Sequence, residues 1–175
     1  MNNKGFTLVE VLVVISIMVI VTGAVVINSG RSKDNVNLYS AKNSIGMNIN
    51  KAKEIALSGV GATIGITNYG VGVWFPDSAG KYYYIYRNNE LLSQDKGYDS
   101  GDLILEKVIL PQGVRYSTVS EKGVLFTPPK PSVSICTGAT TCNSSILTIE
   151  VYAEADATKK EIITVNKAGL VEIDE

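Results

Sequence analysis

The stretch Lys4-Gly5-Phe6-Thr7-Leu8-Val9-Glu10, followed by the apolar run at 11–27, decides the architecture of this chain. Between residues 6 and 27 the only ionisable side chain is Glu10. A run of about 20 apolar residues is the length that a helix needs to cross the core of a bilayer. The sequence therefore predicts a membrane-spanning helix at the start of the chain.

Three simple interpretations of this run remain open on composition alone. A removed signal peptide needs small residues at its cleavage site, and 21–25 is a poor match. A plain membrane anchor has no use for Glu10, because a carboxylate inside the membrane costs about 2.5–3.5 kcal/mol. The third is a buried core helix, although a run this long without a polar stripe is more typical of a membrane span.

The ordered string Gly5-Phe6-Thr7-Leu8-Val9-Glu10-Val11-Leu12-Val13-Val14-Ile15 resembles the N-terminal signature of type IV prepilins and of type II secretion pseudopilins. In that family a prepilin peptidase cuts after the glycine that ends a short basic leader, and then methylates the new amino terminus. The resemblance implies a leader at 1–5, a cut between Gly5 and Phe6, and a methylated Phe6. It also implies that Glu10 is the glutamate that directs filament assembly.

The chemistry of Glu10 agrees with that role. The amine that the cut would create at Phe6 of a neighbouring subunit offers the carboxylate an opposite charge. Removing one member of a buried charge pair leaves an uncompensated charge, at a cost of about 3–5 kcal/mol. We therefore expect Glu10 to hold stacked helices in register, the alternative being a carboxylate that reaches the lipid headgroups.

The composition of the whole chain argues against an enzyme. Its 175 residues carry a formal net charge of −1, with two cysteines and no histidine. The absence of histidine removes the commonest general base and metal ligand, and with it every Ser-His-Asp arrangement. We expect no catalysis and no cofactor, and the near-neutral charge makes nucleic acid an unexpected partner.

A second, amphipathic half of the helix is predicted over 31–58, after a membrane or filament-core half at 6–30. Apolar residues recur there every three or four positions, the spacing of one helix face, at Leu38, Ala41, Ile45, Ile49, Ala52 and Ala56. Asn28-Ser29-Gly30 is a candidate break. If unbroken, the helix is about 75 Å long.

Residues 59–175 are predicted to form a β-rich domain. Runs rich in β-branched and aromatic residues, separated by turn sequences, favour strands at 62–67, 71–75, 82–87, 103–110, 114–119, 124–126, 146–152, 162–165 and 170–173. The fold class is therefore α+β, with a long N-terminal helix packed on a mostly antiparallel sheet. The order of these elements resembles the H-type minor pseudopilins and the FimT-type pilins.

Two further sets of residues are candidate sites. Cys136 and Cys142 are expected to form a disulfide outside the cytoplasm; the alternative is two free thiols, since two cysteines without histidine cannot complete a zinc site. Asp95, Asp99 and Asp102 lie in a glycine-containing loop that offers oxygen ligands for Ca²⁺. A solvated loop is the better interpretation of these aspartates, because their spacing matches no EF-hand and Lys96 weakens the negative field.

Together these features predict a structural subunit of a type IV pilus or a type II secretion pseudopilus. Its expected partners are the prepilin peptidase, the inner membrane, which it would cross once with its C-terminal domain extracytoplasmic, and other pilin or pseudopilin subunits. The alternative is a minor pilin that binds DNA in natural transformation, which the charge disfavours. A membrane-anchored enzyme is a third hypothesis, for which the sequence singles out no acid–base pair.

Overall fold

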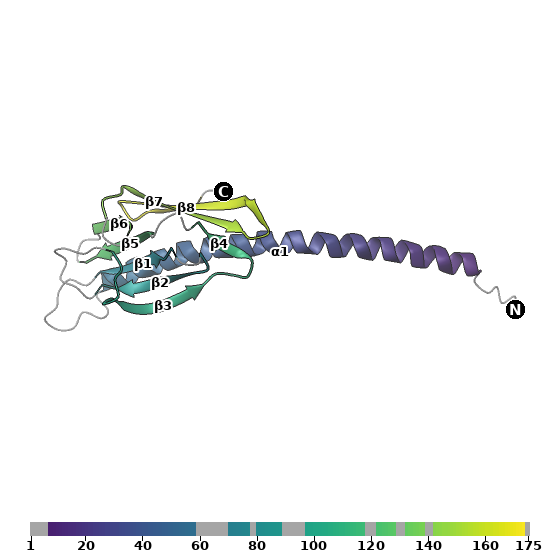
Figure 1. Ribbon diagram of the computed structural model, residues 1–175, viewed down its shortest axis with the longest axis horizontal. Coiled ribbons are helices and arrows are strands. Elements are labelled where there is room, and N and C mark those ends of the chain that lie inside the picture. The colour runs from purple at the N-terminus through teal and green to yellow at the C-terminus, as the bar shows by residue number, and fades with distance from the viewer. Residues whose placement is uncertain are drawn as a thin grey trace.

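The computed structural model describes residues 7–58, 70–77, 80–88, 97–117, 122–128, 132–138 and 142–173, without the side chains at 26–32. Within these ranges the chain forms one long helix that carries a β domain along its C-terminal half and leaves its N-terminal half bare (Figure 1). This is the predicted α+β class.

Helix α1 spans Leu8–Ser58, 51 residues, and runs without interruption through the candidate break at 28–30. At 1.5 Å per residue it is about 77 Å long. This agrees with the length predicted for an unbroken helix.

The strands form two antiparallel sheets. One sheet has the order β3-β2-β1-β5-β6, with β1 at Val71–Phe75, β2 at Tyr82–Arg87, β3 at Leu103–Ile109, β5 at Lys122–Thr127 and β6 at Ser132–Thr137. The other has the order β4-β7-β8-β9, with β4 at Val114–Tyr116, β7 at Ile146–Ala153, β8 at Asp156–Asn166 and β9 at Val171–Ile173. Every strand pairing in the described residues is antiparallel.

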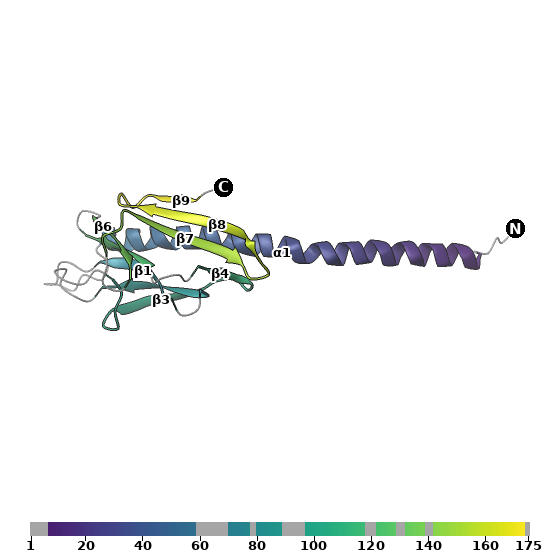
Figure 2. The same cartoon turned by 45° about the horizontal axis from the view of Figure 1, so that its top comes forward.

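The core lies where both sheets close on the second half of α1 (Figure 2). All six apolar positions that the periodicity singles out are buried there: Leu38, Ala41, Ile45, Ile49, Ala52 and Ala56. Three of these six are alanines, whose small side chains let the sheets approach the helix closely. The predicted helix face is confirmed.

The outer face of the five-stranded sheet carries a second, smaller cluster. Trp74 of β1 and Tyr86 of β2 are buried there with Leu125 and Cys136. The ring of Trp74 lies over Gly123 of the neighbouring strand, where an added Cβ would come within 2.3 Å of the ring. A glycine is therefore required at position 123 for this packing.

The largest differences between the predicted and the observed strands are at β6, β8 and β4. Strand β6 was not predicted, because Ser132–Thr137 is short and half polar and follows a proline-rich connector. Strand β8 begins at Asp156 rather than at 162, because its exposed first half contains no apolar run. Strand β4 ends at Tyr116 rather than at 119. The strand expected at 62–67 lies outside the described residues.

Candidate functional site

The start of α1 is closed by a reciprocal cap between Thr7 and Glu10. The Thr7 carbonyl accepts a helical hydrogen bond from the amide of Val11 at 3.3 Å, which makes Thr7 the N-cap residue. The amide and the hydroxyl of Thr7 donate to Oε2 of Glu10 at 2.8 and 2.9 Å, and the Glu10 amide donates to the Thr7 hydroxyl at 3.3 Å. This is a capping box, which satisfies amides that a helix start leaves without partners.

The first half of α1 exposes its apolar side chains on all sides. The segment Leu8–Val25 has a mean hydropathy of 2.7 and none of it is buried within the subunit. A water-exposed apolar surface of this length would be costly, and surfaces of this kind mark membrane or protein contacts. The segment is long and apolar enough to cross a bilayer.

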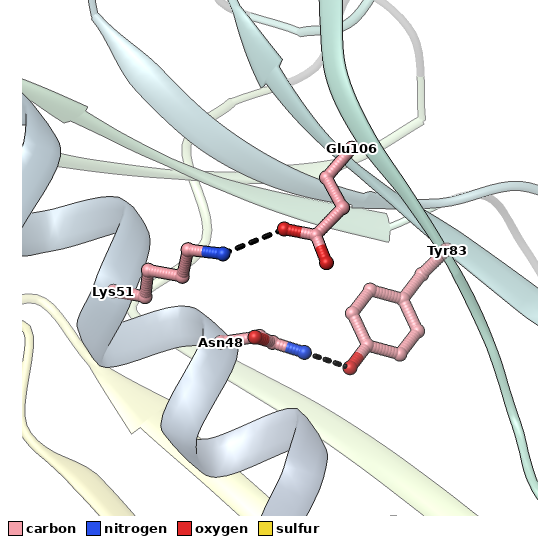
Figure 3. Close-up of polar contacts among 4 residues, drawn as sticks. All are labelled: Asn48, Lys51, Tyr83 and Glu106. Atoms are coloured by element: carbon pink, nitrogen blue, oxygen red, sulfur yellow. Dashed lines mark hydrogen bonds and ion pairs between the residues drawn. The ribbon is translucent and has the colours of Figure 1, made fainter.

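Polar contacts attach the second half of α1 to the five-stranded sheet (Figure 3). The side-chain amide of Asn48 donates to the phenolic oxygen of Tyr83 on β2 at 2.7 Å, and Lys51 pairs with Glu106 on β3 at 2.6 Å. Burial raises the pKa of the Tyr83 phenol, so this hydroxyl stays protonated under ordinary conditions. These contacts fix the rotation of α1 about its own axis relative to the sheet.

A more deeply placed ion pair attaches α1 to the four-stranded sheet. Lys42 and Glu161 of β8 approach to 2.6 Å, and the Lys42 side chain is only 4% exposed. Lys53 adds a hydrogen bond to the carbonyl of Gly169, just before β9. The second half of α1 is thus bound to both sheets. The side of the helix that faces neither sheet is open.

The structure describes only some of the site residues that the sequence predicts. Gly5, Phe6 and Asp95 lie outside the described residues. Glu10 lies at the bare end of α1, far from the β domain, so no described residue other than Thr7 bonds its carboxylate. Its predicted pairing with the Phe6 amine of a neighbour stays a prediction.

The predicted disulfide between Cys136 and Cys142 is present. Cys136 is a buried residue of β6 and packs in the cluster around Trp74, with Cys142 against the same cluster. The disulfide therefore links Cys142 to β6 on the outer face of the sheet.

The aspartates of the candidate calcium loop bond to their own turn. Oδ1 of Asp99 accepts from the amide of Gly101 at 2.5 Å, and Oδ2 of Asp102 accepts from the amide of Asp99 at 3.0 Å. Within the described ranges no group of three or more His, Cys, Asp or Glu residues is placed to hold a metal ion. The interpretation of Asp95, Asp99 and Asp102 as a solvated loop, with Ca²⁺ binding as the alternative, stays a prediction.

Three cations of the described β domain lie beside carboxylates. Glu154 accepts a hydrogen bond from Arg115 and lies 3.5 Å from Lys81, and Lys160 lies 3.5 Å from Glu150. The bond from Arg115 holds the pKa of Glu154 below its ordinary value. Affinity for nucleic acid depends on unneutralised Lys and Arg, so these pairs do not favour the DNA-binding alternative.

The comparison with protein families bears on the segment that contains the cap. Residues 1–26 match the family model for the prokaryotic N-terminal methylation motif. The chain carries a type IV pilin-like signal. The motif supports a subunit that a prepilin peptidase processes and that assembles with other pilin-like chains, and the apolar α1 is consistent with a single-pass inner-membrane anchor.

Apart from the match to this motif, the comparisons found no similar protein. No curated protein and no solved structure is significantly similar to this chain. The resemblance of the β domain to H-type pseudopilins and FimT-type pilins therefore stays a prediction.

Two features of the site were missed from sequence. The capping role of Thr7 has a signal, since Thr7-Leu8-Val9-Glu10 fits the pattern Ser/Thr-x-x-Glu before an apolar run. The Lys42–Glu161 pair has no comparable signal, because its members lie 119 positions apart in the sequence.

Proposed function

We propose that this chain is a structural subunit of a type IV pilus or a type II secretion pseudopilus. It is cut between Gly5 and Phe6, methylated on Phe6, and polymerised through the first half of α1. Residues 1–5 are the leader, 6–30 the membrane or filament-core half of the helix, 31–58 its amphipathic half, and 59–175 an extracytoplasmic domain. The chain itself catalyses no reaction.

The observation that carries this proposal is the bare apolar helix that begins with the Thr7–Glu10 cap. None of its segment Leu8–Val25 is buried within the subunit, and the methylation motif covers the same residues. A membrane covers such a segment before assembly and neighbouring helices cover it afterwards. The same segment therefore serves both stages.

A variant that removes the charge of Glu10 but keeps the helix cap separates its role in assembly from its role in capping. Glutamine caps a helix as glutamate does, so Glu10→Gln preserves the cap and removes only the charge. If the carboxylate pairs with the Phe6 amine of a neighbour, Glu10→Gln leaves that amine without its partner. We expect the amount of filament sheared from cells to fall at least tenfold, with unchanged subunit in the membrane.

The matched control is Glu54→Gln, which removes the charge from an exposed glutamate of the same helix. It should leave filament yield unchanged. A wild-type yield from Glu10→Gln would show that capping is sufficient and would contradict charge pairing between subunits.

A further inference from the structure

Within the described ranges the two sheets have four edge strands, and these differ in what they expose. Strands β3 and β6 border the five-stranded sheet, and β4 and β9 border the four-stranded sheet. Large exposed apolar side chains occur on β3 and at β9, whereas the described residues of β4 and β6 show none. An exposed apolar edge invites pairing with another chain, and proteins normally protect it.

The β3 edge is the larger of the two apolar edges. Its exposed apolar residues are Leu103, Ile104, Leu105 and Ile109, of which Ile109 is 72% exposed. The strand pairs with β2 on one side, and in the described structure its other side has no neighbouring strand. Apolar residues therefore lie beside unpaired backbone groups.

The β9 edge is shorter and lies against α1. Leu170, just before the strand, is 55% exposed, and Ile173 is also exposed. Strand β9 pairs with β8 alone. It can lie this close to the helix because residue 46 is glycine, where an added Cβ would come within 3.0 Å of Ile173.

These edges flank the open side of α1. The β3 edge reaches the helix through Glu106 and Lys51, and the β9 edge through Ile173 and Gly46. At 100° per residue, positions 46 and 51 lie on opposite sides of the buried helix face. Figure 2 shows β3 and β9 on opposite flanks of the domain, with α1 between them.

The open side of α1 carries apolar and polar side chains together. Val36, Tyr39 and Met47 are exposed on this half of the helix, and so are Asn50, Lys51 and Glu54. If the first half of α1 lies in a filament core, the side of the helix that neither sheet covers faces the filament axis. The β3 and β9 edges then face the neighbouring subunits on either side.

We propose that, in the filament, the β3 edge of one subunit packs against the β9 edge of the next copy of this chain. This rests on the proposed function. A filament needs a contact between two different patches, because a patch that binds its own kind closes into a dimer, whereas a head-to-tail contact repeats. The β3 and β9 edges supply two such patches, on opposite flanks.

The direct test is photocrosslinking within filaments of the full chain. Leu105 is replaced by the photoreactive residue p-benzoylphenylalanine, filaments are irradiated, and crosslinked peptides are identified by mass spectrometry. The expected product joins the β3 peptide to the peptide that contains 170–173 of a second subunit. Crosslinks from β3 to β3, to other surfaces, or to no second subunit would overturn the proposal.

The matched control places the same probe at Ile146, an exposed apolar residue on the inner strand β7. It should give no crosslink to 170–173 of another subunit. A crosslink as strong as that from position 105 would mean that the reaction reports random proximity, and would also overturn the proposal.

Charged substitutions test the energetic weight of the contact. Ile109→Lys and Leu170→Lys each place a charge on one edge at a side chain that is mostly exposed. Each should lower filament yield at least fivefold while processing and membrane level stay as in the wild type, and Ile146→Lys should not. Normal yields from both edge variants would contradict the inference alone; an unprocessed wild-type chain would contradict the proposed function.

Discussion

The amide nitrogen of Thr7 lies 2.8 Å from the carboxylate oxygen Oε2 of Glu10, and the Thr7 hydroxyl lies 2.9 Å from the same oxygen. Glu10, the residue that the resemblance implies in filament assembly, therefore also caps the N-terminus of its own helix. In the isolated subunit the cap holds the carboxylate at the helix start, beside the position at which the Phe6 amine would be created.

Removing the Thr7 hydroxyl should loosen this start without changing the charge. Thr7→Val removes two of the three cap bonds, and loss of an N-cap costs about 0.5–2 kcal/mol. We expect the Glu10 amide to exchange its hydrogen about tenfold faster in detergent-solubilised protein. Thr7→Ser keeps the hydroxyl and should exchange as the wild type; equal exchange in the valine and serine variants would rule out the cap.

Lys42 and Lys51 of α1 should contribute differently to the free energy of unfolding. Lys42 is 4% exposed and its partner Glu161 29%, whereas Lys51 and Glu106 are 51% and 46% exposed. Breaking a buried pair costs about 3–5 kcal/mol, while an exposed pair contributes about 0–1 kcal/mol. Lys42→Met should lower the free energy of unfolding by about 3 kcal/mol, because Glu161 keeps some contact with solvent.

The comparison is made by denaturant unfolding of the full chain in detergent. Lys51→Met serves as the control and should change the free energy of unfolding by less than about 1 kcal/mol. Equal effects from both substitutions would mean that the burial of Lys42 carries no energetic weight.

The disulfide should contribute modestly to stability. Cys136 and Cys142 are separated by six positions, and closing so short a loop restricts the unfolded chain by about 2 kcal/mol. The double variant Cys136→Ala, Cys142→Ala should therefore melt a few degrees below the oxidised wild type. An unchanged melting temperature would show that the disulfide adds no stability beyond the packing around Trp74.

Acid should weaken the contact between Arg115 and Glu154. The pKa of Glu154 is held below its ordinary value by the hydrogen bond from Arg115. Such a group adds stability above the unfolded-state pKa of about 4.3, and that contribution is lost as pH falls through the lower folded-state pKa. Glu154→Gln should flatten the fall in stability below about pH 4.3; an identical acid profile would contradict this contribution.

The helical part of the fold was predictable because its signal is local. Ile45, Ile49 and Ala52 recur with the helical period, and each is buried. On β2, Tyr83 and Ile85 enter the main core and Tyr84 does not, the alternation of a strand that turns one face to the core. Such patterns depend only on neighbours along the chain.

The division into two sheets was not predictable, because it depends on distant partners. Strand β1 lies between β2, the next in sequence, and β5, which lies about 50 residues further along the chain. Nothing local at Val73 indicates that it pairs with Val124. The positions of the β3 and β9 edges on either flank of α1 follow from this strand order. They too can be recognised only in the structure.

The part of the candidate site that was predictable is the motif itself. Glu10 stands out as the single charge in an apolar run, which identifies it without a structure. Its bond partner within the described residues, Thr7, is an ordinary residue at a helix start, and its role becomes plain from the geometry of the cap.

The most direct test of the central claim is the intact mass of the protein isolated from membranes of a cell that has a prepilin peptidase. Wild type is compared with Gly5→Ala and with wild type from a host that lacks the peptidase. The account predicts loss of Met1 to Gly5 and gain of one methyl group on Phe6, with neither change in the other two samples. An uncut Met1, or a cut beyond Gly23, would contradict it.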